Sequence, residues 1–158
     1  MADYLAIYLN DHLAGSTLGL ELAKRAAGEH AGTPLGDFLA GLRDEIAADR
    51  RALEEIMDAA GVGEDRLKVV AFWAAEKAGR LKLNGHWLSR SPLSPMVELE
   101  GLATGITGKL LLWRALAATP GVSTAGHSLD ELIARAEAQL AAVEEHRIAV
   151  ASTALARR

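Results

Sequence analysis

Two carboxylates interrupt the apolar side of a stretch with helical periodicity. Apolar residues recur at helical spacing from Leu42 to Ile56, Asp49 falls in a gap of that stripe, and Glu45 precedes it by one turn. An ionised carboxylate on a buried helix face is costly unless it has a partner. Asp49 therefore requires a cation, a proton, a metal ion or exposure to water.

The sequence leaves three interpretations of Asp49 open. In the first, the apolar stripe drifts and Asp49 lies at its solvent-exposed edge. In the second, Asp49 pairs with a cation on a facing helix. Arg147 is the strongest candidate because it interrupts the apolar stripe of the last helical stretch, and a guanidinium can bind a carboxylate bidentately. In the third, Asp49 shares a metal ion with acidic residues of other helices.

Histidines are a second set of candidate functional residues. None of them is spaced as His-x-x-x-His or Glu-x-x-His. His30, His86 and His127 fall in or beside predicted turns, where we expect them to be solvated. His12 lies mid-helix beside Asp11 and is the histidine best placed to act, although a lone mid-helix histidine is more often a core residue than a ligand.

Helical periodicity extends over nearly the whole chain, and strand signals are nearly absent. The pattern predicts one domain, 1–158, with four long helices and one connecting helix, at 3–29, 34–60, 65–84, 94–118 and 128–155. Thr33 before Pro34, and Ser128 three residues before Glu131, are signals for helix N-termini. Short links predict two antiparallel hairpins, and the long connection between them allows the second and third long helices to run parallel.

Two helical hairpins, a long crossover and internal carboxylates resemble the ferritin-like superfamily. The resemblance implies an all-α, ferritin-like four-helix bundle of two antiparallel hairpins with an extra crossover helix. In the di-iron members, helices one and three each supply a Glu, and helices two and four each supply Glu-x-x-His. On this chain the two motifs begin at Glu45 and Glu144, but Ala48 and Arg147 stand at the His positions.

The loss of both His positions favours a bundle without a metal site or other cofactor, which acts through protein interaction or self-assembly. The alternative is a protein that holds an iron or manganese pair with non-standard ligands and performs redox or iron chemistry. Under that alternative the candidate ligands are Asp11, His12, Glu45, Asp49, Glu98 and Glu144. Whether the protein is an enzyme is left undecided by these residues.

Glycines occur inside two of the predicted helices, at a spacing that allows close helix approach. They are Gly15 and Gly19 in the first helix and Gly101, Gly105 and Gly108 in the third long helix. A glycine inside a helix costs about 1 kcal/mol relative to alanine. Tight helix packing is the favoured explanation, and space for an apolar ligand between helices is the alternative.

Composition limits the classes of partner. The net charge of −4 argues against a nucleic-acid surface, which requires clustered Lys and Arg. The absence of cysteine fits a reducing compartment, and the N-terminus lacks the basic region of a signal peptide, so we expect a cytoplasmic protein. No apolar run approaches the roughly 20 residues that cross a bilayer.

The helix at 3–29 is apolar on nearly all sides. This pattern predicts that the helix is well buried, and it favours a homo-oligomer, with a dimer the simplest case.

Overall fold

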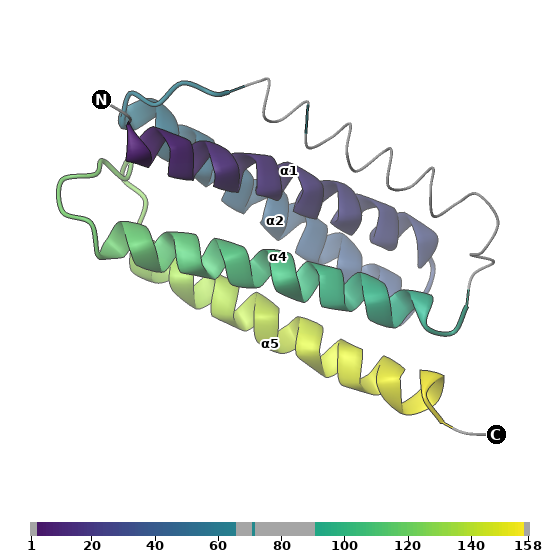
Figure 1. Cartoon of the computed structure of the whole chain (residues 1–158). Coiled ribbons are helices and arrows are strands. Elements are labelled where there is room, and N and C mark those ends of the chain that lie inside the picture. The colour runs from purple at the N-terminus through teal and green to yellow at the C-terminus, as the bar shows by residue number, and fades with distance from the viewer. Residues whose placement is uncertain (1–2, 66–70, 72–90, 157–158) are drawn as a thin grey trace.

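The computed structural model describes residues 3–65, 71 and 91–156, and these residues form four long α-helices without a β-strand (Figure 1). The helices are α1 (Tyr4–Glu29), α2 (Pro34–Ala59), α4 (Ser94–Ala117) and α5 (Leu129–Ala154). The prediction of an all-α chain with these four helices is confirmed. The predicted helix at 65–84 lies outside the described residues, except for residues 65 and 71.

Side-chain caps and glycines fix the helix ends as the sequence predicts. The Thr33 hydroxyl accepts a hydrogen bond from the Gly36 amide at 3.1 Å, and the Ser128 hydroxyl accepts one from the Glu131 amide at 3.3 Å. These bonds satisfy amides that have no partner within the helix. Gly61, with φ of +70°, follows the end of α2 in a conformation that L side chains rarely adopt.

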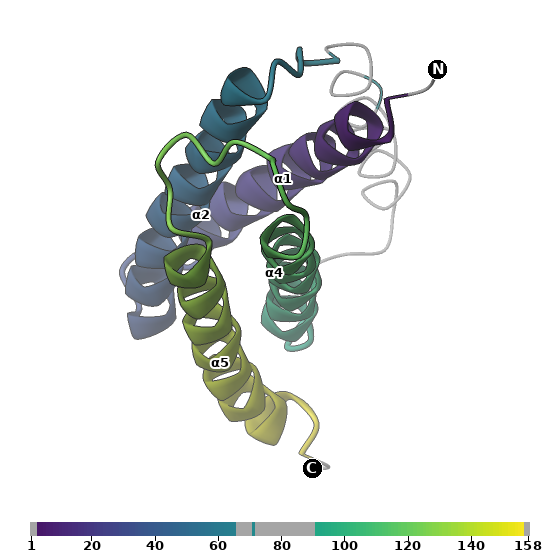
Figure 2. The same ribbon diagram turned by 90° about the vertical axis from the view of Figure 1, so that its left-hand side faces the viewer.

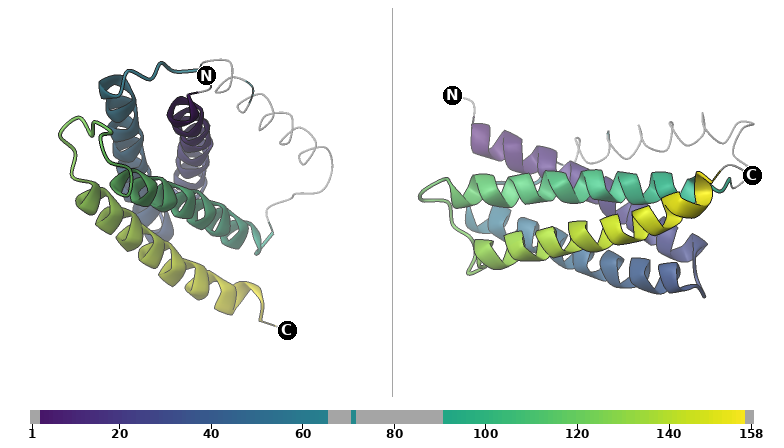
Figure 3. Two further views of the ribbon diagram at one scale, coloured as in Figure 1. Left: turned by 60° about the vertical axis from the view of Figure 1, so that its left-hand side comes forward. Right: turned by 90° about the horizontal axis from the view of Figure 1, so that it is seen from below.

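The four helices form two antiparallel hairpins that cross at an angle (Figures 1 and 3). The first hairpin consists of α1 and α2, and the second consists of α4 and α5. Helices α1 and α4 lie side by side, whereas the backbones of α2 and α5 diverge (Figure 2). Helices α2 and α4 run in the same direction (Figure 1). Each hairpin therefore meets the other along two different interfaces, α1–α4 and α2–α5.

All four helices contribute to one apolar core. Its largest fully buried side chains include Leu9, Leu13, Ile56, Met57, Leu99, Leu102, Ile106, Trp113 and Val143. The prediction that α1 is buried on nearly all sides is wrong for its first two turns, because Tyr4 is 78% exposed and Ile7 and Tyr8 are also exposed. No helix in the described part of the chain is long and apolar enough to cross a membrane.

Candidate functional site

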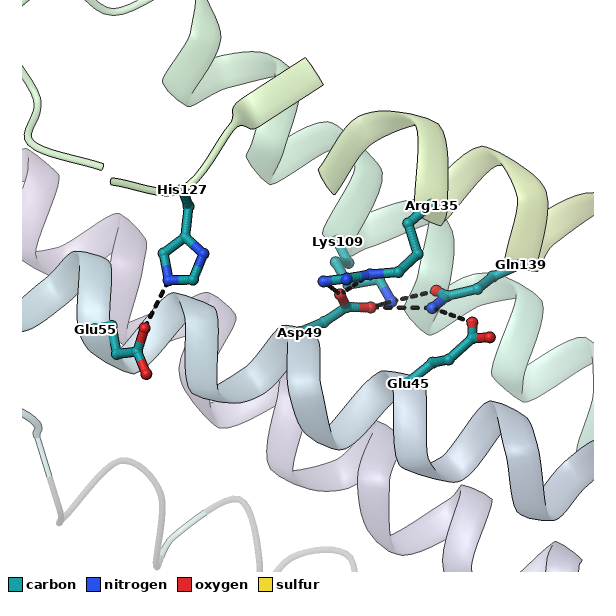
Figure 4. Close-up of polar contacts among 7 residues, drawn as sticks. All are labelled: Glu45, Asp49, Glu55, Lys109, His127, Arg135 and Gln139. Atoms are coloured by element: carbon teal, nitrogen blue, oxygen red, sulfur yellow. Dashed lines mark hydrogen bonds and ion pairs between the residues drawn. The ribbon is translucent and has the colours of Figure 1, made fainter. Parts of the chain in front are cut away.

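Asp49 lies at the centre of a buried polar cluster between α2, α4 and α5 (Figure 4). Its side chain is 2% exposed. Its Oδ2 accepts hydrogen bonds from the Lys109 ammonium at 2.5 Å and from the Gln139 amide at 3.1 Å. Its Oδ1 accepts one from Arg135 Nε at 2.7 Å. Two cations and one amide thus bind a single carboxylate.

This geometry tests the first two of the three interpretations of Asp49, exposure to solvent and pairing with a cation. Exposure at the edge of the apolar stripe is wrong, because the carboxylate is buried. An ion pair with a cation on a facing helix is confirmed, but Arg147 is the wrong partner, since Arg135 and Lys109 occupy that place. Arg147 instead donates to Glu144 at 2.7 Å and to Glu100 at 3.5 Å.

The register between α2 and α5 explains the different partner. Helices α2 and α5 run antiparallel, and polar or aromatic contacts join them at three levels, with a fourth contact from His127 in the loop before α5. In order along α2 they are Phe38–His146, Glu45–Gln139, Asp49–Arg135 and Glu55–His127. Arg147 therefore lies three turns beyond the level of Asp49, near the beginning of α2.

Lys109 and Gln139 complete the cluster, and sequence reasoning missed both. The Lys109 ammonium also donates to Gln139 Oε1 at 2.5 Å, and the Gln139 amide donates to Glu45 at 2.9 Å. Burial lowers the pKa of Lys109, while the neighbouring Asp49 acts in the opposite direction. The sequence does contain a signal for Lys109. It is the one charged residue between Gly101 and Trp113, as Asp49 is a charged residue within an apolar stripe.

The six candidate metal ligands do not all come together at one place. Asp11 and His12 line a cavity that Asp49 also lines, and Glu45 reaches Asp49 through Gln139. Glu98 and Glu144 have other partners, His30 and Arg147. Among the described residues, no three His, Cys, Asp or Glu side chains form a group that could hold a metal ion.

The histidines near turns differ from one another. His30 is mostly covered and its Nε2 lies 2.9 Å from Glu98 Oε2, so the expectation that it is solvated is wrong. Burial, together with a hydrogen bond to Glu29, raises the pKa of Glu98, whereas His30 acts to lower it. His127 is partly exposed and contacts Glu55 at 2.6 Å, and His86 lies outside the described residues.

A cavity of about 180 Å³ lies between α1, α2 and α4. Four glycines line it. They are Gly15 and Gly19 on α1 and Gly105 and Gly108 on α4. A Cβ atom built on any of the four would meet no atom within 4 Å, so tight packing is the wrong explanation there. Tight packing does explain Gly101, where a Cβ would lie 2.9 Å from Leu22 Cδ2.

Comparisons with known proteins identify no relative of this chain. No family model, curated protein or solved structure matches the chain. Membership of the ferritin-like superfamily stays a prediction. The function has to be inferred from the Asp49 cluster, the cavity and the exposed apolar side chains of α1.

Proposed function

We propose that the protein is a ferritin-like helical bundle that requires no metal and acts by associating with a second copy of itself. The observation that carries the metal-free part of the proposal is the pairing of Asp49 with Lys109 and Arg135, and the exposed apolar residues of α1 carry the association. A cytoplasmic location and the absence of a nucleic-acid partner belong to the proposal, as the missing cysteines and the acidic balance suggest.

The cations around Asp49 argue against a metal pair at the centre of the bundle. A divalent ion next to this carboxylate would lie beside the Lys109 ammonium and the Arg135 guanidinium, and like charges repel strongly in a poorly solvated site. The cations also satisfy the acceptor capacity of Asp49 that a metal ion would use. The residues at the two expected His positions, Ala48 and Arg147, offer no replacement ligand.

The first two turns of α1 supply a surface for association. Tyr4, Ile7 and Tyr8 are exposed there, and we call these three residues the α1 patch. Tyrosine is enriched in protein interfaces because its ring buries a large area while its hydroxyl stays hydrogen-bonded. A two-fold dimer uses the same patch on both copies, so one cluster of this kind is sufficient for both sides.

Elemental analysis tests the metal-free part of the proposal. The protein is purified without chelator and measured again after anaerobic loading with Fe(II). We expect no stoichiometric iron or manganese in either sample. Two metal ions per chain would overturn the proposal and support the di-metal alternative, and Glu45→Ala with Asp49→Ala would then be expected to abolish the binding.

Sedimentation velocity tests the association. We expect wild-type protein to form dimers and Ile7→Asp to shift it to monomers, because a charge in the α1 patch opposes burial. Ile148→Asp on α5 is the matched control, since Ile148 is 53% exposed and Ile7 is 44% exposed. A wild-type protein that is monomeric at all concentrations, or equal effects of the two variants, would contradict the proposal.

A further inference from the structure

The two hairpins are joined to each other less extensively than each is packed internally. Helix α1 packs mainly against α2, and α4 packs mainly against α5. Between the hairpins, α1 and α4 lie side by side, whereas the backbones of α2 and α5 diverge (Figure 2). Each hairpin is therefore a unit that meets the other through one limited surface.

The Asp49 cluster lies on that surface and takes its residues from both hairpins. The carboxylates of Glu45 and Asp49 belong to α2, and the groups that bind them, on Lys109, Arg135 and Gln139, belong to α4 and α5. Asp49 is 2% exposed, and a buried carboxylate without a cation is costly. The cluster is thus incomplete in either hairpin alone, and a second hairpin from another chain would complete it equally well.

Each end of the connection between the hairpins is bonded to its own hairpin. At the first end, the Asn10 side chain on α1 accepts a hydrogen bond from the Asp65 amide at 2.6 Å and donates one to the Gly63 carbonyl at 3.0 Å. At the second end, the Ser94 hydroxyl on α4 accepts a hydrogen bond from the Ser91 amide at 3.2 Å. None of these bonds crosses from one hairpin to the other, so all of them would survive an exchange of hairpins between chains.

The chain between those two ends is long enough to reach a neighbouring copy. Residues 66–90 lie between them, and 25 residues span at most about 80–90 Å when fully extended. The longest helices have 26 residues, which corresponds to about 39 Å. A second chain beside the first is therefore within reach of either hairpin.

We propose that two copies of the chain associate by exchanging hairpins, so that Asp49 of one chain is bound by the partner's Lys109 and the partner's Arg135. The exchanged dimer has two such clusters, each built from two chains, and it reuses the contacts of the single chain. This association does not depend on the α1 patch. Because the linked hairpins of one chain meet at a fixed effective concentration, exchange increases with protein concentration.

Cross-linking between two full-length variants tests the exchange, because the chain contains no cysteine of its own. One variant carries Glu55→Cys on α2 and the other carries His127→Cys before α5, at positions whose side chains lie 2.6 Å apart. Both also carry Ile7→Asp, which removes association through the α1 patch. The variants are unfolded in urea, refolded together and treated with a short bismaleimide. We expect a cross-link between residue 55 of one chain and residue 127 of the other, in a yield that rises with protein concentration.

Two controls separate exchange from chance encounters and from ordinary surface contact. In the first, Asp44→Cys replaces Glu55→Cys, because Asp44 is 71% exposed and pairs with Arg43 on its own helix. This pair of variants should give only background cross-linking. In the second, the original variants are mixed briefly while folded, which should also give little product, since the hairpins have to separate before they exchange. No cross-link between residues 55 and 127, or equal yields in either control, would overturn the proposal.

Discussion

The two interfaces between the hairpins use opposite kinds of side chain. Along α1–α4 the helices lie close together, and small residues leave a mostly apolar cavity. Along α2–α5 the backbones diverge, and long polar side chains bridge the gap at several levels (Figure 4). The bundle thus leaves unfilled volume beside the interface where the helices are close, and it places buried charge where they are apart.

The difference suggests that the register of the two hairpins and the packing between them depend on different interfaces. Apolar contacts tolerate sliding of one helix past another, whereas a buried ion pair has few acceptable positions, so we expect the α2–α5 contacts to fix the register between the hairpins. The α1–α4 interface carries no such constraint at its glycines. Variants in each interface should therefore differ in the sign and in the size of their effect on stability.

Loss of the central carboxylate should have the largest effect. Asp49→Ala leaves the buried Lys109 without its carboxylate, and breaking a buried pair in this way costs about 3–5 kcal/mol in the free energy of unfolding. Urea denaturation measures this loss. Asp44→Ala is the control on the same helix, because Asp44 is 71% exposed, and it should leave the free energy of unfolding nearly unchanged. Similar losses in the two variants would mean that the cluster does not stabilise the fold.

Substitution at an open glycine should have the opposite sign. Gly105→Ala should raise the free energy of unfolding by about 1 kcal/mol, because alanine favours the helix and its methyl group meets no neighbour. Gly101→Ala should gain less, since Leu22 has to move. Thermal and urea unfolding of both variants measure this difference. A destabilised Gly105→Ala would show that the α1–α4 interface is more tightly packed than described.

The burial of Glu98 should make stability depend on pH. Because burial raises the pKa of Glu98 above its usual value of 4.5, the folded state binds the proton more tightly than the unfolded chain does. The resulting stabilisation is complete below about pH 4.5 and is lost as the pH rises through the raised pKa. Glu98→Gln cannot titrate, so its stability relative to wild type should increase with pH over that window. Urea titrations between pH 4 and pH 7 measure it, and a constant difference would contradict the assignment.

The exposed end of the α2–α5 interface should matter least. The contact between Glu55 and His127 is largely solvated at Glu55, and surface pairs contribute about 0–1 kcal/mol. Glu55→Gln should therefore change the free energy of unfolding by less than about 0.5 kcal/mol. A loss as large as that of Asp49→Ala would mean that all levels of this interface contribute equally, which the burial difference argues against.

Local signals in the sequence predict the helices and two of the five members of the cluster, Glu45 and Asp49. Thr33 with Pro34 marks the start of α2 and Gly61 follows its end, because capping and glycine geometry depend on neighbouring residues only. The face of α5 that meets Asp49 is also predictable. Residues 135, 139, 143 and 147 recur every four positions and lie on one side of the helix.

Local signals do not predict which residue along that face of α5 lies opposite Asp49. Arg135 and Arg147 belong to the same row of residues along α5, and the relative position of the two hairpins decides which of them reaches Asp49. That position depends on packing between segments far apart in the chain. The open glycines were ambiguous for the same reason, because the spacing of Gly15 and Gly19 fits both close packing and a cavity.

The direction of charge across the α2–α5 interface has a consequence for how the halves of the chain recognise each other. The acids at its contacts, Glu45, Asp49 and Glu55, all belong to the first hairpin, while their donors all belong to the second. Two copies of the first hairpin would bring acid against acid, and two copies of the second would bring cation against cation. Like halves therefore repel, and a first hairpin finds its complement only in a second hairpin, whether in its own chain or in a neighbouring one.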